Sequence, residues 1–320
     1  MPSTAKPTDR TVEVDLGGRL VTVPEGGLYD RFRMDTDLDE VARDPRVSSV
    51  DFFRRMPKSR VDSRIGPTLT PNFYYRISTA RLTMLAPTRA IRARLPRELD
   101  PLEIAPGLGV VSLMAFRYDV CDIDFYTEAA VGIAVKPARH GGLGLFDLVT
   151  GLKNDSLHSY VLSLPVNTEI AQVRGHDGYG FPKWVAELDV DIDAERASAR
   201  LANDRGGLDL ALSAPTPKQT ARPSGGHVST LTSYTTIDGA WHSTTSQINM
   251  LASGTTRFPR DVDLRLGEGR VSDDLRSLKP TRPIQLDVTT EGQLALHMPV
   301  PTSIQDRSRG RSATSPPRPA

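Results

Sequence analysis

The chain has 320 residues, of which 38% are hydrophobic and 25% charged, a composition typical of a folded globular protein with a sizeable core. Its 40 basic and 39 acidic residues leave a net charge of +1, which argues against a nucleic-acid-binding protein. The single cysteine, Cys121, excludes an intrachain disulfide framework and favours a reducing compartment. Because we find neither a signal peptide nor an apolar segment of the ~20 residues that span a bilayer, we expect a cytoplasmic protein without a membrane partner.

The first 65 residues are polar and rich in charge, and we expect residues 1–65 to form a leader that packs on the rest of the protein. A strand is predicted at Leu20–Val23. A helix is predicted to end near Met56, with Asp44 or alternatively Ser49 as its N-cap.

Residues 66–300 are assigned to one main domain, and residues 301–320, rich in Arg, Ser and Pro, to a disordered tail. Runs of aromatic, β-branched or alternating apolar residues predict strands at 72–79, 80–87, 109–120, 126–135, 160–166, 186–193, 198–203, 208–214, 228–237, 244–252 and 284–298. Short helices are predicted from Thr88 to residue 94 and from Thr168 to Arg174, the second stopped by Gly175.

Most of these strands follow one another without the long helices of a βαβ sheet, which favours antiparallel pairing. The clearest alternation is at 186–193, where small or branched apolar residues alternate with acidic ones. We therefore predict an α+β fold that is mostly β: a closed or nearly closed antiparallel β-barrel with a few helices.

The segment DGYGFPKWVA (177–186) sets a lone lysine, Lys183, among apolar and aromatic neighbours. An amine attacks a carbonyl only when it is neutral, and a lysine with the ordinary pKa of ~10.4 is almost wholly protonated at pH 7. Burial against Phe181, Pro182 and Trp184 is one device that favours the neutral form. Lys183 is thus a candidate nucleophile.

The alternative is that Lys183 lays its stem along Trp184 and keeps its ammonium in water. Strand alternation bears on this choice, because Trp184 shares the even-numbered face with Ala186 and Leu188, whereas Lys183 has the opposite face. Lys183 is therefore not expected to share one core with Trp184, although it can still line the interior of a barrel.

A carboxylate, Glu128, interrupts the apolar strand YTEAAVGIAV and shares a face with Tyr126 and Ala130. Burying an unpaired carboxylate is costly, so Glu128 is expected to meet a cation or a substrate, or to hold a proton. The alternative is an edge strand whose face with Glu128 is open to solvent.

Together these motifs resemble acetoacetate decarboxylase and its superfamily, over roughly residues 70–300. The ordered set is Tyr126-Thr127-Glu128, then Leu157-His158, then a short helix ending in Arg174, then Gly180-Phe181-Pro182-Lys183. The resemblance implies the barrel of that superfamily and a lysine nucleophile activated by its surroundings.

Carried over by position, the resemblance implies that Lys183 is the Schiff-base lysine and Glu128 the active-site glutamate. The family holds the substrate carboxylate with an arginine on an early strand, for which Arg76 is the first candidate and Arg81 the second. The remaining residues expected to contact substrate are Tyr126, Phe181 and Trp184.

The function implied is a carbon–carbon lyase that decarboxylates a β-keto acid through an imine on Lys183. No cofactor is required, because the lysine amine itself is the electron sink, and the family implies a homo-oligomer. Family decarboxylases carry a second lysine beside the nucleophile, whereas Lys183 lies between Pro182 and Trp184. The alternatives are therefore a Schiff-base aldolase or dehydratase of the same superfamily, and a barrel that binds a small ligand without turnover.

Two other constellations carry no site. The six histidines lack metal-ligand spacing, so no metal is expected. The glycine-rich segment 142–153 lacks the strand, turn and terminal Lys-Ser/Thr of a phosphate-binding loop.

Overall fold

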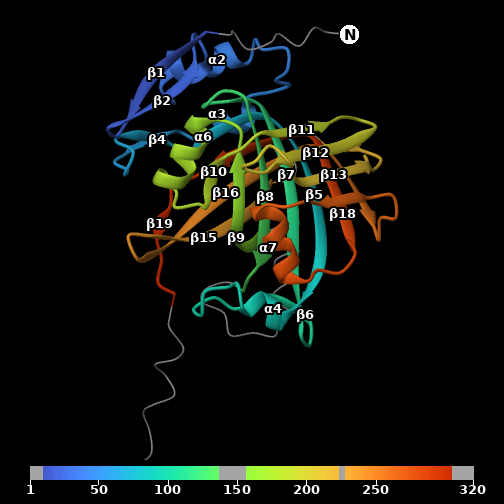
Figure 1. Ribbon diagram of the computed structural model, residues 1–320. Helices are drawn as coiled ribbons and strands as arrows, with labels where there is room; N and C mark the ends of the chain where they lie inside the picture. Colours follow the sequence, from blue (N-terminus) through green and yellow to red (C-terminus); the bar gives the residue numbers. More distant parts are fainter. Residues whose placement is uncertain (1–9, 137–155, 223–227, 305–320) are drawn as a thin grey trace, which may run out of the picture.

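The computed structural model describes residues 10–136, 156–222 and 228–304 (Figure 1). The glycine-rich segment 142–153 and the part of the expected tail after residue 304 lie outside the described residues. Among the described residues, no helix is long and apolar enough to cross a bilayer.

A large ring-like sheet dominates the molecule. Its seven long strands are β5 (Asn72–Pro87), β7 (Leu108–Cys121), β8 (Tyr126–Ala134), β9 (Ser156–Val166), β15 (Val228–Ile237), β16 (Ala240–Arg257) and β18 (Gln285–Leu296). Pairing runs from β5 through β7, β8, β9, β15, β16 and β18 and returns to β5. The prediction of a mostly β fold with a nearly closed sheet is confirmed.

The ring differs from the expectation in one respect, because β15 pairs with β9 in parallel. Parallel neighbours need a long crossover connection, and the chain between β9 and β15 supplies one. That connection contains the helix before Lys183 and most of a second sheet. The prediction of antiparallel pairing, which assumed that successive strands are neighbours, is therefore wrong for β9 and β15.

The second sheet is antiparallel and consists of β11 (Leu188–Ile192), β12 (Arg196–Ala202), β13 (Leu208–Pro215) and β17 (Asp263–Leu266). It crosses the strands of the ring in Figure 1 and shares one buried cluster with them. Leu82, Leu113 and Val131 of the ring pack in this cluster with Leu188 and Leu212 of the small sheet. Since side chains alternate along a strand, the other face of β5, β7 and β8 is free to carry polar groups.

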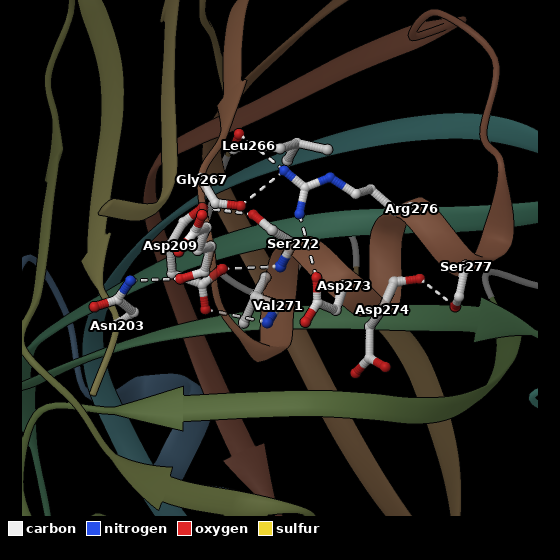
Figure 2. Close-up of polar contacts among 11 residues, drawn as sticks. Asn203, Asp209, Leu266, Gly267, Val271, Ser272, Asp273, Asp274, Arg276 and Ser277 are labelled. Atoms are coloured by element: carbon white, nitrogen blue, oxygen red, sulfur yellow. Dashed lines mark hydrogen bonds and ion pairs between the residues drawn. The ribbon is translucent and has the colours of Figure 1, made fainter. Parts of the chain in front are cut away.

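The helix α7 (Arg270–Leu278) was not predicted, and it buries Val271, Leu275 and Leu278 in the same cluster. Its first turn is capped from a distant strand, because the carboxylate of Asp209 accepts hydrogen bonds from the backbone amides of Val271 and Ser272, at 3.1 and 2.9 Å (Figure 2). No local N-cap precedes the helix, so only the apolar i, i+4 spacing of its residues could have revealed it.

Two of the predicted helices, the one from Thr88 and the one ending near Met56, are present with changed ends. The first, α4, spans Thr88–Arg92, and Thr88 makes no side-chain cap. Instead, its hydroxyl donates to Glu103. The helix expected before Met56 is reduced to α3 (Asp51–Arg54), preceded by Ser49, whose hydroxyl accepts from the Asp51 amide at 3.1 Å. Ser49, not Asp44, is therefore the side chain at this helix start.

The N-terminal elements are β1 (Thr11–Leu16), β2 (Arg19–Pro24), α1 (Leu28–Phe32), α2 (Leu38–Val41), β3 (Ser59–Val61) and β4 (Thr68–Thr70). The strand predicted at Leu20–Val23 is β2. Val14, Val21 and Met34 from this region share a buried cluster with Tyr74 and Tyr126 of the ring. Three further short strands belong to the large sheet: β6 (Glu103–Ala105), β14 (Thr220–Ala221) and β19 (Val300–Pro301).

Candidate active site

The segment that carries Lys183 begins with a distorted helix. The helix α6 (Glu169–Val173) continues directly into a π-helical turn, η1 (Arg174–Gly178), so the prediction that Gly175 stops the helix is wrong. Backbone hydrogen bonds from Phe181 to Gly175 and from Gly180 to His176, at 2.9 and 3.0 Å, then fold the chain back toward the ring. π-helical turns are frequent at functional sites, where the wider turn re-aims the chain.

Gly175 is required because the lysine stem passes directly over it. A Cβ atom at this position would lie 2.2 Å from Cδ and 2.5 Å from Cε of Lys183. Any side chain there would displace the lysine, so the glycine serves close approach and not chain reversal.

The lysine itself begins β10 (Lys183–Val185), a short strand that pairs in parallel with the end of β9. In this register Lys183 is opposite Leu164, and on the other edge of β9 Glu128 of β8 is opposite Val166. β9 therefore lies between the two strands that supply the lysine and the glutamate.

The two side chains meet. Lys183 Nζ lies 2.6 Å from Glu128 Oε2, and the side chains are only 7% and 8% exposed. This contact excludes the alternatives in which Lys183 reaches into water or Glu128 faces solvent on an edge strand. An amine and a carboxylate at this distance can exchange a proton while the surroundings keep bulk water away.

Tyrosine residues surround the pair. Nζ of Lys183 lies 5.5 Å from the centre of the Tyr126 ring, and the Tyr118 hydroxyl donates to Oε1 of Glu128 at 3.1 Å. The Tyr126 hydroxyl in turn donates to the Tyr74 hydroxyl at 3.1 Å. Burial raises the pKa of all three tyrosines, and the negative charge of Glu128 adds to the rise for each. The hydroxyls therefore stay protonated and available as donors.

The two candidate arginines are each paired within the protein. Arg81 donates through Nε and Nη2 to Oδ2 of Asp287, at 3.1 and 2.8 Å. Nη1 of Arg76 lies 3.1 Å from Oε2 of Glu291, and Nη2 donates to the Thr290 carbonyl. Among the described residues, neither forms a hydrogen bond or an ion pair with Lys183 or Glu128.

Sheet register places Arg81 of β5 on the same face of the large sheet as Glu128 of β8. Arg81 is opposite Met114, which is opposite Ala130, and cross-strand partners share a face. Ala130 is two residues from Glu128 and points the same way. Two strand spacings, roughly 10 Å, separate β5 from β8. Arg81 is therefore on the same face as Glu128, but the strand β7 lies between them.

The two aromatic residues near the lysine, Phe181 and Trp184, pack against different parts of the protein. Phe181 packs with Ala130, Leu164 and Tyr179 on the site side of the sheet. Trp184 packs instead against the cluster under the small sheet, with Arg270 lying 5.2 Å above its ring. It lines a surface hollow of about 230 Å3. The opposite orientation of Lys183 and Trp184 is what strand alternation predicted.

The sequence interpretation missed three contributors: Tyr118, Tyr74 and Gly175. Tyr118 shares a face of β7 with Phe116 and is directly opposite Tyr126, but the register that brings it to Glu128 is not visible in one sequence. Gly175 was interpreted as a helix end, because a glycine after an apolar turn usually marks one.

Comparison with known proteins identifies a family and a shared fold. The family model described as acetoacetate decarboxylase (ADC) matches residues 55–298. A structure from structural studies of acetoacetate decarboxylase superposes with a TM-score of 0.52 at 13% identity, covering 72% of this chain and 89% of that one. The acetoacetate decarboxylase of Legionella pneumophila gives 0.51 at 12% identity, covering 82% and 95%. These two likenesses show a shared fold, and no curated protein matches the chain.

Proposed function

Because the chain belongs to the acetoacetate decarboxylase family, we propose that it is a lyase that forms a Schiff base between Lys183 and a small oxo acid. We further propose that decarboxylation of a β-keto acid is its reaction. The observation that carries this proposal is the buried hydrogen bond of 2.6 Å between Lys183 and Glu128. A nucleophilic amine with a proton acceptor at that distance, shielded from bulk water, is the arrangement that imine formation needs.

The first steps move one proton within the pair. Glu128 takes a proton from the Lys183 ammonium, which leaves a neutral amine and a protonated carboxyl group. The amine adds to the ketone carbonyl. The adduct then loses its hydroxyl as water, with the proton that Glu128 returns, which gives an iminium ion and leaves Glu128 as a carboxylate. Tyr118 holds Oε1 of Glu128 in place, so that Oε2 keeps its position beside Nζ.

The iminium ion then accepts the electron pair of the breaking C–C bond, and CO2 leaves. The product is an enamine, which is protonated at carbon by a proton that water supplies through Glu128. Hydrolysis by water releases the ketone and restores the lysine. Every electron pair stays on substrate and lysine, so this route needs no further electron acceptor.

Of the two expected carboxylate ligands, the second candidate, Arg81, lies on the face of Glu128, but its guanidinium is bound to Asp287. For Arg81 to hold substrate, the substrate carboxylate has to replace Asp287. Arg76 faces the same requirement toward Glu291.

A second candidate reaction is aldol addition or dehydration through the same imine. The observation in its favour is that Pro182 and Trp184 flank Lys183, where family decarboxylases carry a second lysine. Tryptophan and proline carry no charge, and the Trp184 side chain also packs away from the site.

Product analysis separates the candidates. Purified protein is incubated with acetoacetate, and separately with pyruvate plus an aldehyde, alongside Lys183→Arg in each case. Release of CO2 that depends on Lys183 supports decarboxylation, whereas a condensation product without CO2 supports the aldolase. Binding of the acid with neither product in wild type would leave only the non-catalytic barrel.

A further inference from the structure

One buried cation near the pair has no acidic partner. Arg174, the first residue of η1, is 2% exposed, and it is the only arginine among the described residues that is fully buried. Its Nη1 donates to the Thr68 hydroxyl at 3.2 Å, but Nε and Nη2 have no hydrogen-bond partner in the described part of the chain. Buried donors without partners are rare in proteins and point to a missing acceptor.

The two free nitrogens form one edge of the guanidinium. Nε–H and one N–H of Nη2 point in the same direction, which is the geometry that binds a carboxylate with two parallel hydrogen bonds. Arg81 shows the same edge in use, since its Nε and Nη2 both donate to Asp287. In Arg174 this edge is open.

The local charge balance also calls for an anion. Lys183 is paired with Glu128, and Lys58 lies 2.6 Å from the fully buried Asp122. Burial lowers the pKa of Lys58 and the positive charge of Arg174 lowers it further, against the pull of Asp122, so these two cations lie near one another. Arg174 is thus a third buried cation beside two carboxylates, and a buried charge without a partner is costly.

Tyrosines connect Arg174 to the lysine. The Tyr179 hydroxyl is buried close to the guanidinium, and both the charge of Arg174 and its side-chain contact with Tyr179 oppose the rise that burial causes in the pKa of Tyr179. The Tyr74 hydroxyl is within electrostatic reach of both Tyr179 and Glu128. In addition, Gly175, the neighbour of Arg174 in the chain, contacts the Lys183 stem. Arg174 and Lys183 therefore belong to one buried polar cluster.

We propose that the Nε–Nη2 edge of Arg174, assisted by the Tyr179 hydroxyl, binds the carboxylate of the oxo acid whose carbonyl reacts with Lys183. This inference rests on the proposed function, and it assigns substrate recognition to a residue of η1 in place of an arginine on β5. A substrate carboxylate bound there would accept hydrogen bonds from Nε and Nη2 of Arg174 and would also balance the positive charge of this arginine.

The test compares an acid with its ester. Borohydride trapping on Lys183 is measured as a function of concentration for pyruvate and for methyl pyruvate, which has the same ketone without the negative charge. Loss of a charge-assisted pair in Arg174→Met is expected to raise the half-maximal pyruvate concentration by about 10- to 100-fold, while the methyl pyruvate curve moves by less than about 3-fold. Arg174→Lys should fall between Arg174→Met and wild type, and Arg265→Met, at an exposed pair with Asp263, is the matched control.

Thermal unfolding without ligand separates recognition from structure. Because the Arg174 guanidinium has no acidic partner, Arg174→Met is expected to unfold at or above the wild-type temperature. A lower unfolding temperature, with both trapping curves weakened alike, would mean that the arginine only supports the fold and would overturn the inference. An unchanged pyruvate curve, or a loss of acid preference in Arg81→Met alone, would overturn it too. If wild type traps neither compound, the proposed function fails first, and this subsite fails with it.

Discussion

The Lys183–Glu128 hydrogen bond is the residue-scale feature on which the chemistry depends. Glu128→Gln keeps the size of the side chain and its hydrogen bonding but cannot take the proton from the amine. We expect turnover of the preferred oxo acid to fall by about 100- to 10,000-fold, the usual range for losing a general base. Steady-state kinetics measure the effect, and near-wild-type turnover by a folded Glu128→Gln enzyme would exclude Glu128 as the proton acceptor.

Tyr118 is expected to act through Glu128. Tyr118→Phe removes the donor to Oε1 and leaves the ring in place, so turnover should fall by about 10-fold, in line with the loss of one hydrogen bond to a charged group. Combining Tyr118→Phe with Glu128→Gln should cost little more than Glu128→Gln alone. Additive losses in the double variant would show that the hydroxyl acts independently of the glutamate.

At this scale the sequence revealed residues whose chemistry conflicts with their neighbours. Lys183 among aromatic residues and Glu128 in an apolar strand both broke the local pattern, and the structure brings them together. Arg174 and Tyr118 raised no such conflict. Their burial depends on the η1 turn and on strand register, which local patterns do not encode.

Among the elements, η1 matters most because it carries Gly175 under the lysine. Gly175→Ala would place a methyl group 2.2 Å from Cδ of Lys183, so we expect trapping on Lys183 to fall by at least about 10-fold while the protein still folds. The matched control is Gly132→Ala on β8, where a Cβ would meet only the Tyr160 carbonyl, at 4.0 Å. Equal trapping by the two alanine variants would contradict this role.

Asp124, a buried carboxylate at the start of α1, is expected to make the free energy of unfolding depend on pH. Asp124 accepts hydrogen bonds from the amides of Leu28 and Tyr29, and burial raises its pKa to about 6. The folded state thus binds this proton more tightly than the unfolded state, where the pKa is about 3.9. The resulting stabilisation is complete below about pH 4 and is lost as the pH rises through 6, by at most about 3 kcal/mol.

Asp124→Asn tests this directly, because asparagine is uncharged at every pH, keeps one acceptor oxygen for the Leu28 amide and tolerates the left-handed backbone at this residue (φ 66°). Urea unfolding at pH 4.5 and pH 7 should show Asp124→Asn gaining stability relative to wild type as the pH rises. A constant difference between the two proteins would refute the assignment.

The strands were predictable wherever one face of the strand is buried. β11, β12 and β15 match their predicted ranges closely, because alternation or β-branched content extends through each. By contrast, α7 depends on Asp209, 60 or so positions earlier in the chain, and a remote cap leaves no local signal.

On the scale of the whole molecule, the buried ion pair of Lys58 and Asp122 connects the N-terminal region to the ring. Lys58 donates to Asp122 at 2.6 Å and also to the Met34 carbonyl, while Asp122 accepts from Thr36 and Tyr75. We propose that residues 1–65 are a leader that depends on the main domain, and these contacts support that view.

Lys58→Met should lower the free energy of unfolding by about 3–5 kcal/mol, because it leaves Asp122 buried without a cation. Arg265→Met, which breaks an exposed pair, should cost less than about 1 kcal/mol. Chemical denaturation of both variants provides the comparison. Similar losses in the two would show that the Lys58 pair contributes no more than a surface contact.

The ring itself could be predicted as a class but not as a topology. Many short strands joined directly indicate a closed antiparallel sheet, yet the parallel contact of β9 with β15 depends on where the chain returns after the small sheet. That return path is set by packing between the two sheets, which no local pattern records.

The central claim is that Lys183 forms an imine with an oxo acid, and the most direct measurement is the mass of the peptide that contains Lys183 after borohydride reduction in the presence of acetoacetate. The account predicts an isopropyl group on Lys183, left by the decarboxylated product, and its absence from Lys183→Arg. An unmodified Lys183 in folded, acetoacetate-saturated protein, or a modification confined to other lysines, would contradict it.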